Sequence, residues 1–322
     1  MTPQTAPLWQ RLHPTLRDAL GPEIAAALAD PNVKDIELNS NGLLFLDKMI
    51  PDNNEQVPIG RMSHETADTI IRLVASYMGV SATPDTPRVA GTLPSGERFQ
   101  GMLPPIVEHP AFVIRKPPSI IFTLADYVRD GIISEAAAAF LSEAAADRLN
   151  ILVAGGAGSG KTTLTNALLA TPAFKEGRIL IIQDVDELQC DAPNHLSMFT
   201  KPAPPAVTMR DLIKDSLRLN PTRIVVGEVR DGSALDMLRA WNTGHPGGLA
   251  TLHANSALDA LYRIEDLTSE VSEIVPKRAI AASINIVVFI MRTATGRRVT
   301  EISRITGVDH TGYLFDNLSD LL

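Results

Sequence analysis

Residues 151–163 read Ile-Leu-Val-Ala-Gly-Gly-Ala-Gly-Ser-Gly-Lys-Thr-Thr, and this stretch decides the fold of the second half of the chain. Its central part, Gly155 to Thr162, matches the pattern G-x-x-x-x-G-K-[ST]. The apolar run 151–154 before it indicates a buried strand, and residues 162–170 after it have the pattern of a helix. Strand, loop and helix in this order predict a phosphate-binding loop, because an incidental glycine-rich turn would not need that frame.

The glycines of this loop let successive backbone N–H groups turn toward an anion at the start of a helix, whose dipole favours negative charge. Lys161 is placed to reach the β- and γ-phosphates of a nucleotide, and the Thr162 hydroxyl is placed to bind Mg²⁺. The expected nucleotide-binding residues of the loop are Gly155, Gly156, Ala157, Gly158, Ser159, Gly160, Lys161, Thr162 and Thr163. The loop alone does not say what the energy of hydrolysis drives.

Short apolar runs alternate with helical patterns through the second half. The expected strands are 151–154, 179–183, 224–227, 249–253 and 286–291. Near-continuous apolar strands are typical of a sheet with helices on both faces, so we expect a doubly wound, mainly parallel α/β sheet. Capping-box patterns predict three helix starts, at Thr208…Asp211, Ser233…Asp236 and Ser256…Asp259.

The first half has the pattern of a small α+β domain. It combines a helix over 14–29 that Gly21-Pro22 interrupts, a hairpin around Asn41-Gly42 and a helix to Met78 that Ser63 caps. The prolines of Lys116-Pro-Pro-Ser119 mark a boundary, since they stiffen the chain and remove two hydrogen-bond donors. We therefore expect an N-terminal domain over 1–118, a linker over 119–133 and a P-loop domain over 134–322.

Composition excludes several classes of protein. With 322 residues, 45% hydrophobic and 20% charged, the chain is globular and long enough for about two domains. A formal charge of −8 argues against a basic surface for nucleic acid. The single cysteine, Cys190, excludes an intramolecular disulfide and a multi-cysteine zinc site. Residues 1–10 lack the apolar core of a signal peptide, and no apolar run approaches the length of a membrane span.

Acidic residues follow two of the expected strands. Glu228 ends the strand 224–227, where a carboxylate can face the phosphates and orient or deprotonate the attacking water. Gly227 stands where many P-loop folds have a metal-ordering aspartate, so the carboxylates for Mg²⁺ would come from Asp184, Asp186 or Glu187 after the neighbouring strand. The alternative for the 184–187 cluster is a set of ordinary turn residues.

Histidines and arginines supply further candidates, each with a plain structural alternative. His253 is either a hydrogen-bonded structural residue or a sensor that donates to the γ-phosphate, and its spacing from His245 does not indicate a metal pair. Arg98 and Arg115 are either surface arginines or a charge clamp on the phosphates, delivered across a cleft between domains.

Four ordered motifs and one strand give the chain a resemblance over almost its whole length. They are the P-loop with Thr163, Asp184-Val-Asp-Glu-Leu-Gln189, Leu217-Arg-Leu-Asn-Pro-Thr-Arg-Ile-Val-Val-Gly-Glu-Val-Arg230, Gly244-His-Pro-Gly-Gly-Leu-Ala-Thr-Leu-His-Ala-Asn-Ser256, and upstream Phe112-Val-Ile-Arg-Lys-Pro117. They resemble the P-loop, acidic box, Walker B region, histidine box and last N-domain strand of the hexameric ATPases of type IV secretion and conjugal transfer, and among these the TrbB-like branch. The acidic box departs from the family at Gln183-Asp184, where Glu-Asp is expected. The lone cysteine departs from the tetracysteine module common in type II secretion and pilus-assembly relatives.

The resemblance implies a RecA-like ATPase domain after a smaller α+β N-terminal domain, in a homo-hexameric ring. It implies an Mg²⁺-dependent ATPase that powers pilus biogenesis or substrate transfer through nucleotide-driven domain motion. It assigns Glu228 as the catalytic carboxylate, His253 as the γ-phosphate sensor, and Arg98 and Arg115 as N-domain phosphate contacts. Thr162, Asp184 and Glu187 are the expected Mg²⁺ residues, with ATP as the nucleotide. The implied setting is cytoplasmic or peripheral on the inner membrane, with secretion or conjugation components as partners and without sequence-specific binding of nucleic acid.

Three other functions stay open at the level of sequence. A type IV pilus assembly or retraction ATPase would use the same chemistry in a different machine. A DNA translocase would need a basic lining, which the net charge of −8 disfavours. A scaffold that binds ATP without turnover would not need Glu228.

Overall fold

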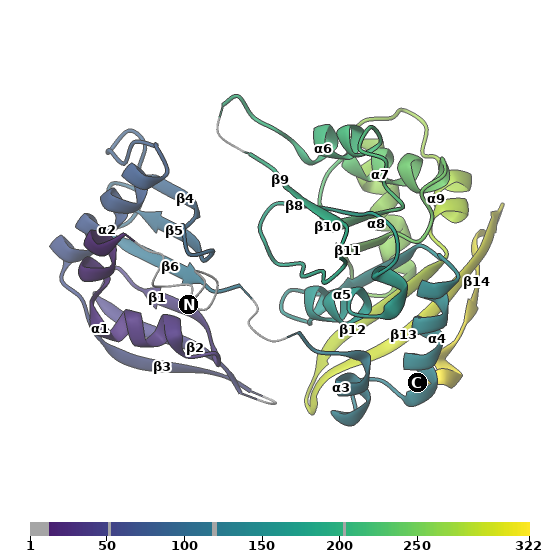
Figure 1. The fold of residues 1–322 in the computed structure, drawn as a ribbon, viewed down its shortest axis with the longest axis horizontal. Helices are drawn as coiled ribbons and strands as arrows, with labels where there is room; N and C mark the ends of the chain where they lie inside the picture. Colours follow the sequence, from purple (N-terminus) through teal and green to yellow (C-terminus); the bar gives the residue numbers. More distant parts are fainter. Residues whose placement is uncertain (1–12, 51–52, 118–120, 202–203) are drawn as a thin grey trace. The chain divides into compact units, whose positions relative to one another are not determined.

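The computed structural model describes residues 13–50, 53–117, 121–201 and 204–322. It divides into two compact units, residues 1–120 and residues 121–322, each with its own sheet (Figure 1). The N-terminal stretch 1–10 and Pro118 of the expected boundary lie outside the described residues.

The first unit is a layer of helices on an antiparallel sheet, which confirms the α+β architecture expected for this half. Within the described residues its strand order is β3-β2-β1-β6-β5-β4. The bounds are α1 Pro14–Ala29, β1 Val33–Leu38, β2 Leu43–Ile50, β3 Asn53–Arg61, α2 His64–Tyr77, β4 Arg88–Thr92, β5 Arg98–Met102 and β6 Ala111–Arg115. The two helices contact each other and the sheet, and together they enclose one apolar core.

Local signals act in this unit as the sequence predicts. Gly21 leaves the helical region at φ 78°, so α1 consists of two pieces. The Ser63 side chain accepts from the Thr66 N–H and caps α2, and Gly79 adopts φ 66° after the helix ends.

The second unit contains one larger sheet. As far as the structure describes it, the strand order is β14-β13-β12-β7-β11-β10-β8-β9. The six strands from β12 to β9 are parallel, and β13 and β14 add an antiparallel extension. The strand bounds are β7 Ile151–Gly155, β8 Ile179–Gln183, β9 His195–Phe199, β10 Arg223–Val229, β11 Leu249–His253, β12 Ile286–Thr293, β13 Gly296–Asp309 and β14 Gly312–Asn317.

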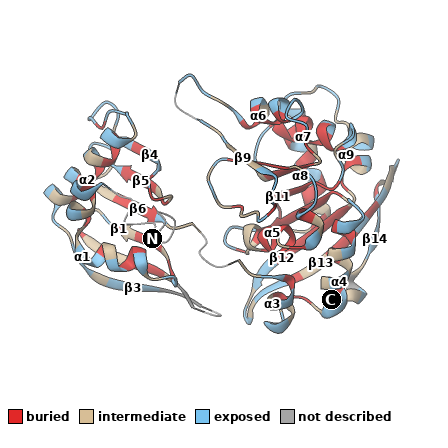
Figure 2. Ribbon diagram, viewed as in Figure 1, coloured by how far each residue is buried: buried red, intermediate tan, exposed pale blue. Residues whose placement is uncertain are grey.

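Helices cover both faces of this sheet, which explains the continuous apolar runs. Along β7, Leu152 and Ala154 pack into one core, whereas Ile151 and Val153 pack into the other. The first core includes residues of α6 Met209–Ser216, α7 Ser233–Asn242, α8 Ala257–Ser269 and α9 Lys277–Ser283. The second includes residues of α3 Leu124–Arg129, α4 Glu135–Ala146, α5 Lys161–Leu169 and the 3₁₀ turn η2 Pro172–Phe174. Another 3₁₀ turn, η3, spans Ser319–Leu321. Figure 2 shows the buried residues concentrated along these strands.

The stretch 119–133, expected as a linker, carries α3. Thr123 and Asp126 form a capping box, and Leu124, Tyr127 and Ile133 are buried in the second unit. The apolar positions at 124, 127 and 133 give this short helix a face to bury.

Thr208 and Asp211 form the predicted capping box at the start of α6. At α8 only half of the predicted box forms, because Ser256 accepts from the Asp259 N–H while the Asp259 carboxylate accepts from the Asn255 N–H. The prediction at Ser233 is wrong, because α7 begins at Ser233 itself after Gly232. The Asp231 side chain accepts from the Ser233 N–H at 2.8 Å, and Asp236 instead binds Arg210 at 2.6 Å.

Trp241 joins α7 to the sheet. Its indole Nε1 donates to the Ile224 carbonyl of β10 at 3.1 Å. A Cβ on Gly248 would lie 2.1 Å from the same nitrogen, so only glycine fits beside the ring. Among the described residues, no helix is both long enough and apolar enough to cross a bilayer.

Candidate active site

The carboxyl ends of the parallel strands meet at one edge of the second sheet. The loop 156–160 follows β7, while His253 ends β11 and lies opposite Gly155 in register. Glu228 lies near the end of β10, the next strand beyond β11. In open α/β sheets this edge is where ligands bind.

The loop after β7 has the backbone that its glycines predict. Gly158 and Gly160 adopt φ 67° and 101°, a region that favours glycine. A Cβ on Gly155 would lie 2.2 Å from the Ile290 carbonyl oxygen of β12, so a larger residue would push the two strands apart. Gly155 ends β7, and the other predicted residues, 156–163, lie in this loop or in the first turn of α5.

The loop fits an anion. Gly160 is the N-cap of α5 and supplies no side-chain cap, so the first N–H groups of the helix are not capped by a side chain. Ser159 Oγ is buried and has no hydrogen-bond partner within the described residues. Donors of this kind at a helix N-terminus bind phosphate oxygens.

Lys161 folds back over the loop and is 7% exposed. Its Nζ donates to the carbonyls of Gly155 at 3.0 Å and Gly156 at 2.8 Å, and it lies 3.4 Å from His253 Nε2. Burial lowers the pKa of Lys161, although the Glu228 carboxylate opposes that shift. An incoming phosphate would restore a counter-charge to this buried ammonium group.

His253 and Glu228 are in contact, which the sequence did not establish. His253 Nε2 lies 3.1 Å from Glu228 Oε1, and the carboxylate of Glu228 is mostly buried. Burial, together with the charge of Lys161, lowers the pKa of His253 below its usual 6.5, although Glu228 pulls it upward. The lowered pKa favours the neutral imidazole, which has one N–H to donate.

Arg230 is a residue of the site that sequence reasoning missed. Its Nε donates to Glu228 Oε2 at 2.7 Å, a second nitrogen also contacts that oxygen, and a third lies 3.4 Å from Asp184 Oδ2. Burial alone would lower the pKa of Arg230, but the hydrogen bond and charge of Glu228 outweigh it and raise that pKa. Arg230 thus links Glu228 to the acidic box.

The acidic box is organised by the amide that replaces the expected glutamate. Gln183 Oε1 accepts from the backbone N–H groups of Glu187 and Leu188 at 3.1 and 2.9 Å, and its Nε2 donates to Asp186 at 3.2 Å. Thr200 donates to Asp184 at 2.7 Å. Among the described residues, no group of three or more His, Cys, Asp or Glu side chains gathers as a metal cluster. Asp184 remains half-exposed beside Arg230.

Arg98 and Arg115 belong to the first unit, where the structure brings them together. They are register partners on β5 and β6. Arg115 donates to both carboxylate oxygens of the buried Asp35, at 2.7 and 3.2 Å, while about half of its side chain stays exposed. The guanidinium of Arg115 is therefore held at a fixed place on the sheet.

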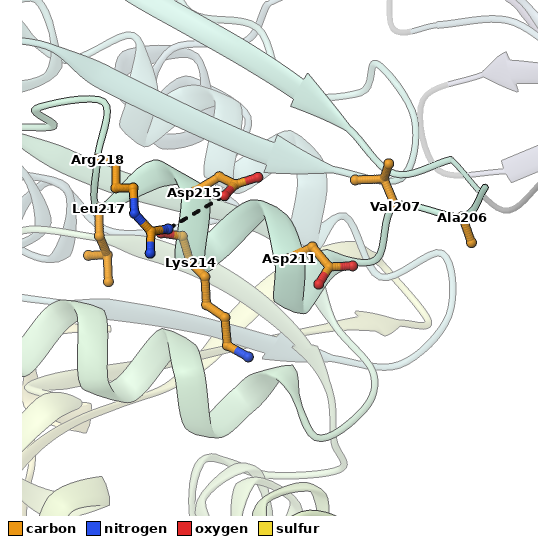
Figure 3. Close-up of a pocket in the computed structure, with 7 residues that line it drawn as sticks. All are labelled: Ala206, Val207, Asp211, Lys214, Asp215, Leu217 and Arg218. Carbon is orange, nitrogen blue, oxygen red and sulfur yellow. Dashed lines mark hydrogen bonds and ion pairs between the residues drawn. The ribbon is translucent and has the colours of Figure 1, made fainter. Parts of the chain in front are cut away.

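Two hollows of the second unit differ in size and in the residues that line them. One of about 640 Å³ lies on α6 and is lined by Ala206, Val207, Asp211, Lys214, Asp215, Leu217 and Arg218 (Figure 3). Its charges are mixed, and it contains none of the predicted site residues. A smaller hollow of about 220 Å³ adjoins Gly156 and His253, and it also includes Asn255 and Arg263. The smaller hollow, and not the larger one, lies beside the candidate site residues.

Comparison with known proteins places the chain among secretion proteins. A family described as "Type II/IV secretion system protein" matches residues 64–305. The conjugal transfer protein TrbB of Rhizobium radiobacter is 41% identical over 314 residues, which cover 97% of this chain and 95% of that protein. The type IV secretion system protein VirB11 of Bartonella henselae is 32% identical over 285 residues, covering 77% and 79%.

A solved structure supports the fold. The ATPase DotB of Yersinia pseudotuberculosis superposes with a TM-score of 0.65 at 17% identity, covering 95% of this chain and 82% of that one. The expected fold, a P-loop α/β unit after a smaller α+β unit, is confirmed.

Proposed function

The chain belongs to the family of type II/IV secretion system proteins, and from this premise we propose that it is an ATP-hydrolysing motor of a type IV secretion or conjugal transfer apparatus. One observation supports the chemistry above all. Lys161, His253 and Glu228 form a chain of contacts at 3.4 and 3.1 Å beside the phosphate loop. Phosphoryl transfer to water requires a positive charge beside the phosphates, a hydrogen-bond donor to them, and a carboxylate that orients the attacking water. Lys161, His253 and Glu228 are residues of these three kinds.

In this proposal the loop and Lys161 bind the β- and γ-phosphates of ATP. His253 donates to the γ-phosphate, and Glu228 orients the attacking water and accepts its proton. Arg230 holds Oε2 of Glu228 by a hydrogen bond, whereas Oε1 forms no hydrogen bond among the described residues and is the oxygen available to accept from the water.

The proposed Mg²⁺ residues are Thr162, Asp184 and Glu187. Their hydroxyl and carboxylate oxygens are the ligands that Mg²⁺ prefers. The uncapped N–H groups of the loop would bind the phosphates, and the phosphates would supply further oxygen ligands to the ion. When bound, Mg²⁺ would neutralise the charge that develops between the β- and γ-phosphates. Asp184 is already paired with Thr200 and Arg230, so we assign it a role in holding water around the ion.

We further propose that Arg98 and Arg115 contact the phosphates from the N-terminal domain, 1–118, which a linker over 119–133 joins to the ATPase domain, 134–322. A guanidinium that is fixed by Asp35 and still half-exposed supports this role. The proposed assembly is a homo-hexameric ring in the cytoplasm that docks peripherally on inner-membrane components. Its proposed function does not require sequence-specific binding of nucleic acid.

The same chemistry would also serve a pilus assembly or retraction motor, but the relatives named above are proteins of conjugal transfer and type IV secretion. A DNA translocase is disfavoured by the charge of −8. Single-stranded or double-stranded DNA should therefore leave the ATPase rate unchanged, and strong stimulation would favour the translocase.

Two substitutions test the proposal. Glu228→Gln should still bind ATP but hydrolyse it about 100-fold more slowly or worse, because the water loses its base. Lys161→Ala should bind ATP weakly, because the loop loses its ammonium group. Phosphate release and nucleotide binding on the full chain measure both effects, with circular dichroism to show that each variant folds. Turnover like that of the unmodified protein in either variant would rule out the assigned role.

A further inference from the structure

The β12–β13 hairpin presents three exposed arginines next to the phosphate loop: Arg292, Arg297 and Arg298. None of them forms an ion pair within the part of the chain that the structure describes. Arg292 and Arg297 are directly opposite each other across the two strands. Like charges in that position repel, so the pair favours an anion between or beside them.

Arg297 lies along the phosphate loop itself. Its Nε lies 3.4 Å from the Gly158 carbonyl, a long hydrogen bond, and its Cδ lies 3.0 Å from the place that a Cβ on Gly160 would take. Glycine at 160 therefore lets this side chain approach. The two terminal nitrogens of Arg297 form no hydrogen bond among the described residues, so the guanidinium retains its fork of donors.

The order of the strands tells which part of a nucleotide reaches this arginine. β7 lies between β11, which ends in His253, and β12, which leads into the arginine hairpin. The γ-phosphate belongs on the side of His253 and Glu228. Because a nucleoside triphosphate binds in an extended form, its α-phosphate lies toward the opposite side of the loop, where Arg297 is.

We propose that Arg297 binds the α-phosphate of the nucleotide. This inference rests on the nucleotide site proposed above and assigns a further binding residue to it, outside the recognised motifs. A guanidinium donates two parallel hydrogen bonds to phosphate oxygens, a geometry that suits this contact. Its contribution is to hold the nucleoside end while Lys161 holds the other phosphates.

The experiment compares ADP and GDP, whose α-phosphate is joined to a nucleoside, with pyrophosphate, which has no nucleoside. Isothermal titration calorimetry on the full chain would measure ADP, GDP and pyrophosphate. Arg297→Ala should weaken ADP and GDP by the same factor, about tenfold or more, because each loses a charged hydrogen bond. Pyrophosphate, which can occupy the β- and γ-positions, should bind as before.

Matched variants separate binding from a structural role. Arg298 alternates to the other face of β13, so Arg298→Ala should leave all three affinities within about twofold. Arg297→Gln can still donate to Gly158 but lacks the charged fork, and it should behave like Arg297→Ala. Full ADP affinity in Arg297→Gln, or equal losses for ADP and pyrophosphate in Arg297→Ala, would mean that Arg297 only steadies the loop and would overturn the inference. Unequal losses for ADP and GDP would overturn it in favour of a contact with the base.

The two proposals fail in different ways. If the unmodified chain binds neither ADP nor pyrophosphate, the nucleotide site itself is wrong, and the role of Arg297 falls with it. If the unmodified chain binds both and Arg297→Ala binds ADP equally well, only the assignment of Arg297 is wrong.

Discussion

His253 is the residue whose titration best reports on the site, because groups of opposite charge act on it. Burial and Lys161 lower its pKa, and Glu228 raises it. A histidine with a lowered pKa binds its proton less readily when folded than when unfolded. The folded state is therefore favoured above the unfolded pKa near 6.5 and loses this advantage as the pH falls below it.

Substitution of either neighbour should move this pKa in a known direction. Lys161→Ala removes a positive charge and should raise the pKa of His253, whereas Glu228→Gln removes a negative charge and should lower it further. Imidazole resonances of His253 followed by NMR between pH 4.5 and 8 measure both shifts, with His310 as an exposed control. Shifts of the same sign in the two variants would contradict the charge arrangement described for the site.

At this scale the sequence predicts a residue where the motif itself fixes the geometry. The glycines and Lys161 are of this kind, because the turn and the helix start dictate where each must lie. Arg230 could not be found in the same way. The expected strand ended at 227, but β10 continues to Val229, so the alternation that places Glu228 and Arg230 on one side was not visible. Which acid an arginine pairs with is decided by tertiary structure.

Gly227 matters for how β10 sits beside β8. A Cβ on Gly227 would lie 2.9 Å from Gln183 Cβ, and neither atom can rotate away. The glycine that stands in place of a metal-ordering aspartate is thus also required by packing against the amide that organises the acidic box. The position of Glu228, one residue later, depends on this close approach.

Gly227→Ala should destabilise the fold by about 1–3 kcal/mol, the usual cost of overpacking. It should also reduce turnover, because β10 must shift and carries Glu228 with it. Urea unfolding followed by circular dichroism measures the first effect. Gly156→Ala is the control for stability without nucleotide, since a Cβ there meets nothing within 4 Å. Equal unfolding midpoints for the two variants would refute the packing argument.

The sequence predicts those elements in which the pattern of apolar residues is unbroken, and it misses those in which this pattern is interrupted. The central strands of the second unit are apolar on both faces and short, which leaves few alternatives. β13 was missed because Val299, Ile302 and Ile305 are buried at intervals of three, which is a helical spacing. A bulge opposite Phe289 and Ile290 lengthens the first interval by one residue, and Ile302 and Ile305 lie in different cores, so the second interval spans the two faces of the strand. β9 was missed because it is a half-exposed edge strand of mixed composition.

At the scale of the whole molecule, the proposed ring should respond to nucleotide. A ligand that binds the assembled form more tightly stabilises it by mass action. Light scattering should therefore show a larger particle, of about six subunits, when an ATP analogue and Mg²⁺ are added. Repeated head-to-tail contacts that close around an axis give a defined size, whereas contacts that do not close give filaments.

Arg115→Lys provides the matched variant for this measurement. Lysine keeps a charge near the buried Asp35 but cannot copy the fork of donors, so the unit should fold while the response to nucleotide weakens. A strict monomer at micromolar concentration with and without the analogue would refute the ring. An assembly of Arg115→Lys that responds fully to nucleotide would remove Arg115 from the proposed phosphate contacts.

Trp241 gives this chain a built-in optical reporter. The chain has two tryptophans, and the other, Trp9, lies outside the described residues. In a Trp9→Phe background all indole emission would come from a ring that is 2% exposed and bonded to Ile224. Since Ile224 and Glu228 belong to the same strand, any loosening of that strand would admit water to the ring and shift its fluorescence to the red. The intrinsic emission of one side chain thus follows, in real time, the strand that carries Glu228.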